Sequence, residues 1–432
     1  MTDAAADPRS GRAARNGALQ RGLKKRYARE ARFRFYGLLA IAIALGFLFL
    51  LLGRIIEQGH TAFTENQITV PVYMDPARID RDYPQGTNFQ LLVAEQQLVR
   101  LGVVDDAQGT QATAYRTLLS SELKFRAADL VRRDPSVIGR TVEITAPVSD
   151  EADLYYKGKI TRDEAAALRR VSDQQMAWLD ELKRDGAVRS GFNTLLFTQG
   201  DSTEPELAGV LGAVIGSALM LLVTALIAIP LGVGAAVYLE EFARKGRITD
   251  LIEVNINNLA AVPSIVYGLL GLALFINFAH LPRSSPLVGG LVLALMALPT
   301  IIIATRSSLK AVPPSIREAA LAMGASRTQT VFHHVLPLAM PGVMTGTIIS
   351  MAHALGETAP LLLIGMVSFV PGIPGAINEP AGALPSLVYI WENASELAFH
   401  ERTAAAILVL LTFMIVMNAA AILLRRRFER RW

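Results

Sequence analysis

The sequence predicts an all-α polytopic membrane protein with six transmembrane helices and an α+β domain inserted after the first of them. Its 432 residues are 52% hydrophobic, with a mean hydropathy of +0.35. Long uncharged runs reach the roughly 20 residues that a helix needs to cross a bilayer. Arginine and lysine gather at both ends of the chain, which places both termini in the cytoplasm and explains the net charge of +4 without nucleic acid.

The N-terminal segment, residues 1–34, carries ten basic residues against three acidic ones. This charge excess predicts a disordered cytoplasmic segment. The transmembrane helix expected over residues 35–56 follows, with its apolar run ending at Leu52. A cleaved signal peptide is disfavoured, because the basic part is too long, the apolar run exceeds the usual length and no small-residue cleavage site precedes Gly53.

Residues 57–206 form a segment of domain size, which the positive-inside rule places in the periplasm. Cysteine is absent, so no disulfide stabilises it. No metal cluster, nucleophile arrangement or phosphate loop is recognisable there, and a packing domain is favoured over an enzyme or a ligand site. Helical periodicity occurs in residues 89–102, 117–133 and 161–186, and strand alternation in residues 140–148.

Residues 207–425 contain the five remaining spans, and the basic tail 426–432 keeps the C-terminus inside. Pro263, followed by Ser264, should open its helix locally because proline removes a backbone hydrogen bond. Such an opening serves either as a structural kink or as a gate. The expected spans are residues 209–237, 257–279, 287–304, 341–367 and 403–424, with a cytoplasmic loop at 238–253.

A polar insert at residues 314–337 interrupts these spans. Ser315 with Glu318, and Ser326 with Gln329, form two Ser-x-x-Glu/Gln capping boxes, which predict two short helices. Gly324 lies between them as a left-handed cap, and Pro337 is expected to end the second helix. The unit is tethered too closely to the spans to act as a DNA-binding helix-turn-helix. The first helix should dock another protein through Ile316, Ala319, Ala320 and Met323.

A few ionisable residues lie at membrane depth. Glu357 is expected well inside an apolar helix, where a carboxylate costs about 2.5 to 3.5 kcal/mol and needs a partner. Arg306 ends the preceding span, so an Arg306 to Glu357 pair that closes or lines the transport path is one hypothesis. The alternative is a buried structural hydrogen bond or a screened interfacial charge. His353 lies four residues before Glu357 on the same face. His333 and His334 point in different directions and are interpreted as surface residues.

The motifs resemble a known family. Glu318-Ala319-Ala320, Gly324 and Leu336-Pro337 resemble the EAA loop of permease subunits in bacterial ATP-driven importers. Four further stretches, together with Arg317-Glu318-Ala319-Ala320, follow the order seen in PstA-type permeases of phosphate importers, over residues 207–425. These stretches are residues 232–241, 259–268, 298–299 with Arg306, and 355–360.

The resemblance implies a type I ABC importer fold in the cell inner membrane, with this chain forming half of a phosphate path. It implies a second related permease, a dimeric cytoplasmic ATPase that binds ATP and Mg²⁺, a periplasmic phosphate-binding protein and surrounding lipid. No G-x-x-x-x-G-K-[ST] loop occurs, so we expect no ATPase site, catalytic residue, cofactor or metal in this chain. The implied coupling residues are Glu318, Ala319, Ala320, Gly324, Leu336 and Pro337, and the path or gate residues are Arg306, Glu357, Pro263 and Ser264.

Two alternatives stay open at this stage. Permeases for sulfate or molybdate share the EAA loop, and the binding protein largely selects the solute in such importers. A membrane-anchored sensor with residues 57–206 as its receptor is a different class of function, disfavoured because no output module follows. The 57–206 segment is larger than the family pattern requires, and contact with the binding protein is only one interpretation of its role.

Overall fold

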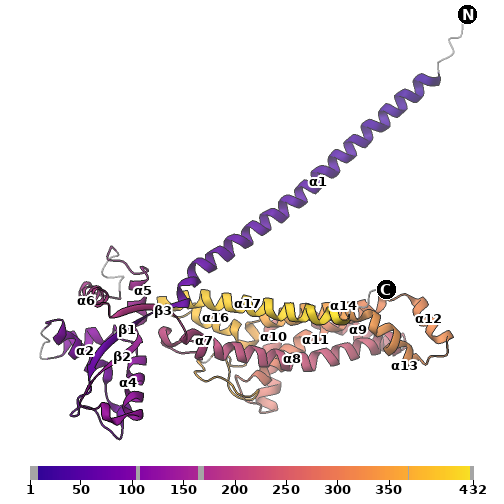
Figure 1. Ribbon diagram of the computed structural model, residues 1–432. Coiled ribbons are helices and arrows are strands. Elements are labelled where there is room, and N and C mark those ends of the chain that lie inside the picture. The colour runs from indigo at the N-terminus through magenta and orange to yellow at the C-terminus, as the bar shows by residue number, and fades with distance from the viewer. Residues whose placement is uncertain (1–7, 104–107, 164–169, 368, 429–432) are drawn as a thin grey trace, which may run out of the picture. The chain divides into compact units, whose positions relative to one another are not determined.

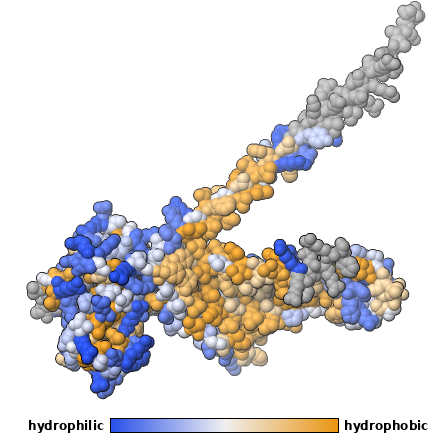
Figure 2. Space-filling model, in the orientation of Figure 1, coloured by the Kyte–Doolittle hydropathy of each residue, from blue (hydrophilic) through white to orange (hydrophobic). Residues whose placement is uncertain are grey.

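The computed structural model describes residues 8–103, 108–163, 170–367 and 369–428, in two units, 1–57 and 58–432. Helix α1 runs unbroken from Pro8 to Gly59 (Figure 1). It contains an apolar stretch long enough to cross a membrane, as predicted, which Figure 2 shows as an orange section. The prediction of disorder is wrong from Pro8 onward. Proline is favoured in the first turn of a helix. The alanine, arginine and lysine residues that follow have high helix propensity, and the helical apolar stretch after them lets the helix extend toward the N-terminus without a new nucleation step. Residues 1–7 lie outside the described residues.

An α+β domain opens the second unit. Its sheet has the strand order β2-β1-β3, and both pairings are antiparallel, with Val70 of β1 opposite Ile144 of β2. Three strands alone do not enclose a core, so one face of the sheet is covered by helices. The elements are β1 (Thr64–Tyr73), α2 (Phe89–Arg100), α3 (Thr110–Arg116), α4 (Glu122–Arg133), β2 (Thr141–Pro147), α5 (Asp150–Tyr156), α6 (Asp173–Arg184) and β3 (Val188–Phe192).

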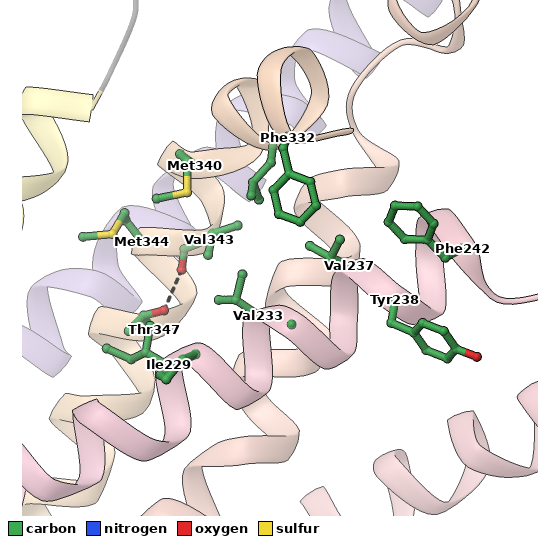
Figure 3. Close-up of a pocket in the computed structure, with 13 residues that line it drawn as sticks. Ile229, Val233, Val237, Tyr238, Phe242, Phe332, Met340, Val343, Met344 and Thr347 are labelled. Atoms are coloured by element: carbon green, nitrogen blue, oxygen red, sulfur yellow. Dashed lines mark hydrogen bonds between the residues drawn. The ribbon is translucent and has the colours of Figure 1, made fainter. Parts of the chain in front are cut away.

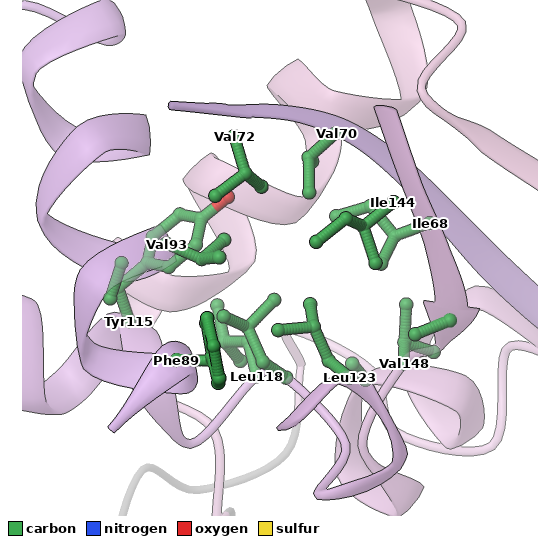
Figure 4. Close-up of a cluster of buried hydrophobic side chains, with 14 of the residues drawn as sticks. Ile68, Val70, Val72, Phe89, Val93, Tyr115, Leu118, Leu123, Ile144 and Val148 are labelled. Carbon is green, nitrogen blue, oxygen red and sulfur yellow. The ribbon is translucent and has the colours of Figure 1, made fainter. Parts of the chain in front are cut away.

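The core of this domain forms between the sheet and helices α2, α4 and α6. Alternate residues of β1, among them Ile68, Val70 and Val72, point to the same face and are fully buried. Figure 4 shows them facing Phe89 of α2 and Leu123 of α4 across a contiguous apolar cluster. Each Å² of apolar surface that this cluster removes from water stabilises the domain by about 25 cal/mol.

The expected helices at 89–102 and 117–133 and the strand at 140–148 are confirmed by α2, α4 and β2, with shorter bounds. The helix expected over 161–186 begins only at Asp173, where Ser172 caps it, and residues 164–169 lie outside the described residues. Strands β1 and β3 were not predicted. Pro71 lies within β1 and Gly191 within β3, and both residue types are depleted in strands.

The rest of the unit is helical. Within the described residues, five helices, α1 included, are long and apolar enough to cross a membrane, and a bent pair makes a sixth if it counts as one span. The apolar helices of residues 207–428 form the orange band beside the bluer α+β domain (Figure 2). The elements are α7 (Leu195–Thr198), α8 (Leu211–Val237), α9 (Arg247–Ala260), α10 (Ser264–Gly271), α11 (Pro286–Lys310), α12 (Pro314–Ala322), α13 (Arg327–Gln329), α14 (Leu336–Gly356), α15 (Ala359–Leu363), α16 (Leu384–Glu392) and α17 (Leu397–Phe428).

Helices α8 and α11 pack closely against each other. Thr224 of α8 donates its hydroxyl to the carbonyl of Gly290 in α11 at 3.1 Å, and a Cβ built on Gly290 would meet the Met220 carbonyl oxygen at 2.7 Å. The small Gly290 therefore allows α8 and α11 to approach closely, as small residues do between membrane helices.

The third span differs from the expectation. Residues 257–279 were expected to form one helix after a cytoplasmic loop at 238–253. Instead, a π-helical turn, Tyr238–Phe242, extends α8, and α9 begins at Arg247, inside the expected loop. Helix α9 then meets α10 and its π-helical extension Leu272–Phe278 at 100°. The local opening at Pro263 is confirmed, since the bend lies between Ala260 and Ser264.

The fifth span is also different. It was expected over residues 341–367, but α14 ends at Gly356. The ring of Pro360 would clash with the carbonyl of Gly356, four residues earlier, so a continuous helix is disfavoured there. Glu357 takes an extended conformation, with φ −77° and ψ 128°, before the short helix α15.

Candidate functional site

The polar insert folds as a short helix α12, a glycine turn and a second helix. Gly324 has φ +87°, the left-handed conformation that the sequence predicted. The Ala325 amide donates to Ala320 O at 3.1 Å and the Gly324 amide to Leu321 O at 3.0 Å, which is the hydrogen-bond pattern of a Schellman cap. The Ser326–Gln329 capping box is confirmed by both of its reciprocal bonds.

Two other local predictions for this unit are wrong. Ser315 does not cap α12, which begins one residue earlier at Pro314, because two successive prolines fix φ near the helical value. Pro337 does not end the second helix, which continues from Arg327 to Gly356. A π-helical segment, Thr330–Val335, precedes Pro337, and its wider turns tolerate the missing proline N–H.

Only two of the four residues on the expected docking face of α12, Ala319 and Met323, are exposed. Ala320 is buried and Ile316 is half-buried against the apolar cluster of Val312, Val331 and Val335. Glu318 and Ala319 are exposed, as are Leu321 and Met323, whose exposed fractions are 50% and 88%. One side of α12 therefore packs against the protein through Ile316 and Ala320. The opposite side is exposed and presents a small surface of mixed apolar and acidic residues.

A buried ion pair fixes α12 to the end of α8. Arg317 Nη2 lies 2.6 Å from Glu241 Oε1, and Arg317 Nε lies 3.2 Å from both carboxylate oxygens. The same guanidinium donates to the Leu309 and Val312 carbonyls, at 2.9 and 2.8 Å, at the C-terminal end of α11. Only 9% of the Glu241 side chain is exposed. One arginine thus joins three elements, a geometry that its rigid fork of donors suits.

A second ion-pair cluster lies beside the first. Arg306 Nη2 is 2.9 Å from Glu253 of α9, Arg306 Nε is 3.4 Å from Glu240 at the end of α8, and Lys310 Nζ is 3.7 Å from the same Glu240. The hypothesis that Arg306 pairs with Glu357 is therefore wrong for this conformation. Arg306 lies at the end of its span, where Glu240 and Glu253 are close enough to pair with it in place of Glu357.

Glu357 lies at the break after α14. The Glu357 side chain is 17% exposed, and its Oε1 lies 3.1 Å from Nε2 of His353, one helical turn earlier, which is itself 70% exposed. The same-face placement of His353 is confirmed, whereas a position inside a regular helix is not.

Pro263 and Ser264 form the corner between α9 and α10. The hydroxyl of Tyr267 donates to Leu259 O at 2.7 Å and so bridges the corner. Pro263 is exposed and Ser264 half-exposed. His333 and His334 are exposed as interpreted, while Leu336 and Pro337 are half-buried at the start of α14.

An apolar groove of about 540 Å³ separates α8 from the helix that carries the insert (Figure 3). Val233 and Val237 of α8 line one side, and Met340 and Met344 of α14 line the other. The Thr347 hydroxyl is directed back to Val343 O at 2.9 Å, so the groove offers little that could hold an anion.

Sequence reasoning missed the Arg317–Glu241 pair. Its signal was the doubled acid Glu240-Glu241 directly after an apolar span, together with an arginine in the polar insert. The partners are 76 residues apart, so the pairing itself needed the tertiary structure.

Comparisons with known proteins agree with the motifs. Residues 228–432 match the family described as binding-protein-dependent transport system inner membrane component. The chain is 33% identical over 228 residues to the probable ABC transporter permease protein YqgI of Bacillus subtilis, covering 49% of this chain and 76% of that protein. It is 34% identical over 238 residues to the phosphate transport system permease protein PstA 1 of Mycobacterium tuberculosis H37Rv, covering 55% and 76%. This chain belongs to the PstA-type ABC permeases.

Other matches complete the comparison. The PstA permease of Haemophilus influenzae is 30% identical over 223 residues, which cover 52% of this chain and 78% of that protein. Among solved structures, the inward-facing MetNI methionine ABC transporter matches 51% of this chain and 95% of that chain, with 19% identity and a TM-score of 0.38, too weak a likeness to support an argument. Residues 20–166 match a domain of unknown function (DUF3333). The PstA-type family therefore accounts for the membrane domain and leaves the α+β domain unassigned.

Proposed function

We propose that this PstA-type permease imports inorganic phosphate as one half of an ATP-driven translocation path. The choice of phosphate is supported by relatives named for phosphate transport, at 30 to 34% identity over about half of the chain. Sulfate or molybdate is the competing solute. The selective step belongs to a periplasmic binding protein, and a second related permease completes the path.

Energy reaches this chain through α12. The observation that carries this part is the combination of an exposed outer surface, around Glu318, Ala319 and Met323, with the buried Arg317–Glu241 anchor behind it. A dimeric cytoplasmic ATPase, which binds ATP and Mg²⁺, docks on the outer surface. When the ATPase closes, the anchor passes the displacement of α12 directly to α8, because a buried ion pair resists extension.

The gate lies where α8, α9 and α11 meet. Arg306 ties α11 to Glu240 and Glu253, so movement of the α8 end shifts α9 and the corner at Pro263 and Ser264. Glu357, on the break after α14, stays available to line the path. The apolar groove beside α14 accommodates the shift.

The orientation follows from charge. The basic residues near both termini and around Arg244 to Arg247 face the cytoplasm of a cell inner membrane, and the α+β domain lies in the periplasm. Helix α12 is then on the cytoplasmic side, where an ATPase reaches it.

The test is ATP-dependent uptake of labelled phosphate into vesicles that contain this chain, the second permease, the ATPase and the binding protein. Uptake that survives excess unlabelled sulfate or molybdate supports the phosphate assignment. Inhibition by sulfate or molybdate moves the assignment to that oxyanion, and absence of uptake with all partners present contradicts the importer function.

Two variants locate the coupling and the path. Gly324→Asp places a side chain at φ +87° and distorts the turn behind α12, so uptake should vanish while the complex still assembles. Glu357→Gln keeps the shape and removes the charge, so it should lose uptake with normal membrane assembly. Wild-type uptake in Glu357→Gln would remove that residue from the path.

A further inference from the structure

A small buried cavity lies where the α+β domain meets the start of α17. Its volume is about 20 Å³, which is room for a single water molecule. Helix α5 forms one wall, α17 another, and the short 3₁₀ turns His60–Phe63 and Pro205–Leu207 close the remaining sides. The lining is almost entirely charged and consists of Asp150, Asp153, Lys157, Glu206, Glu401 and Arg402, with Ala62 and Ala398.

Two of the four carboxylates are directly paired. Lys157 Nζ lies 2.7 Å from Asp153 Oδ2 and 2.8 Å from Glu401 Oε1, and only 9% of the Lys157 side chain is exposed. Asp153 Oδ1 also accepts from the backbone and side-chain nitrogens of Asn66, at 3.0 and 2.9 Å. Lys157 therefore bridges the α+β domain to α17 across 244 residues of sequence.

The second cation is held by the backbone as well. Arg402 is 8% exposed and donates to Ala208 O at 2.7 Å. Among the described residues, no ion pair joins Asp150 or Glu206 to a cation. The lining thus holds four carboxyl groups against one lysine and one arginine. Ionisation of all four carboxyls would leave two negative charges in excess, in a space with room for about one water molecule.

The environment of these two carboxyls opposes their ionisation. Burial raises the pKa of Glu206 to about 7, with Asp150 and Glu204 raising it further and Arg402 lowering it. Burial also raises the pKa of Asp150, to about 8, and Glu151 adds to that effect while Arg170 opposes it. Glu65 of β1 faces the same group of charges, near Arg402 and Asp153, and burial raises its pKa too.

We propose that the α+β domain is a proton-controlled regulatory domain, in which the neutral forms of Asp150 and Glu206 keep α5 docked on the start of α17 and their ionisation releases it. Under this proposal the α+β domain regulates the permease and takes no direct part in moving the solute. Helix α17 belongs to the membrane domain, so release of α5 frees the outer end of that helix.

The direction of the pH dependence follows from linkage. A carboxyl whose pKa is higher when docked than when released binds more protons in the docked state. Docking contributed by Glu206 is therefore complete below its ordinary value of 4.5 and is lost as the pH rises to about 7. Asp150 extends the window upward to about 8. Low pH closes the junction, and alkaline pH opens it.

Hydrogen exchange of the full chain in lipid nanodiscs tests this inference. The exchange rates of α5 amides, divided by their intrinsic rates at each pH, give the opening constant of the junction. Between pH 6 and pH 8 this constant should rise about tenfold from Glu206 alone and further with Asp150, from the linkage of each carboxyl. A constant that stays level over this range would overturn the proposal.

Matched variants identify the groups responsible. Asp150→Asn with Glu206→Gln should abolish the pH response of α5, whereas Glu143→Gln, at an exposed carboxyl on β2, should keep it. If the double variant fails to fold, Glu206→Gln alone should reduce the response by about tenfold. A wild-type response in that single variant would assign the pH dependence elsewhere and contradict the inference.

Discussion

The two charged junctions of this permease are built on opposite principles. At the end of α8, one arginine meets one buried glutamate and spends its remaining donors on two backbone carbonyls. At the start of α17, four carboxylates share a cavity with two cations. The first junction pairs one positive group with one negative group. The second is balanced only when two protons are present, so it suits regulation rather than force transmission.

The largest expected effect comes from removing the cation of the balanced junction. Arg317→Ala leaves Glu241 buried without a partner and frees two carbonyls at the end of α11. Breaking a buried pair in this way costs about 3 to 5 kcal/mol, and the partial exposure of Arg317 places this case at the lower end. Thermal unfolding of the purified protein should show the loss. An unchanged unfolding temperature would mean that the pair contributes nothing to the fold.

A smaller effect is expected at the unbalanced junction. Lys157→Met removes the bridge between Asp153 and Glu401, but Asp153 retains both bonds from Asn66. We expect a loss of about 2 to 3 kcal/mol, the range for a buried polar group left partly unsatisfied. Denaturant unfolding at pH 6 and pH 8 provides the measurement. The loss should be greater at pH 8, where Glu206 is also ionised, and an equal loss at both values would contradict the shared-cavity interpretation.

The glycine turn behind α12 should contribute less. A Cβ added at Gly324 would meet nothing within 4 Å, so Gly324→Ala carries only the conformational cost of φ +87°, about 1 to 2 kcal/mol. Uptake should fall several-fold without loss of assembly. Gly234→Ala is a suitable control, because it also adds a methyl group to open space but lies within a regular helix. Equal uptake in the two variants would remove the turn geometry from the coupling mechanism.

The smallest effect is expected for Glu206→Gln at acid pH. Below its ordinary value of 4.5 the carboxyl is neutral in both the folded and the unfolded chain, and glutamine preserves its volume, so stability near pH 4 should change by less than about 0.5 kcal/mol. As the pH rises to about 7, the wild type should lose stability and the variant should become the more stable protein. Unfolding curves across pH 4 to 9 would show this divergence, and a constant offset between the two proteins would argue against a titrating group at this position.

Local patterns predicted the local structure of the insert. The Ser326 capping box and the Gly324 turn involve residues at most a few positions apart, and both are present. The Ser315 box failed because neighbouring prolines set the helix start, and the expected end at Pro337 failed because a π-helical segment absorbs that residue. In each failure a competing local rule prevailed.

Long-range pairing was beyond the sequence. Arg306 was recognised as a charge needing a partner, but Glu240, Glu253 and Glu357 were all available to it, and only the packing of α8, α9 and α11 selects the first two. The cavity at α17 was missed altogether. Lys157 and Glu401 of its lining are 244 residues apart, and each charged residue alone resembles an ordinary surface charge.

The most direct test of the coupling mechanism exchanges the charges of the balanced junction. Arg317→Glu alone and Glu241→Arg alone should each abolish ATP-dependent phosphate uptake, because two like charges then face each other in a buried site. The double exchange restores an opposite pair and should recover a measurable part of uptake, with ATPase binding intact throughout. Loss of uptake in the single variants with no recovery in a correctly assembled double variant would contradict the claim that this pair transmits movement from α12 to α8.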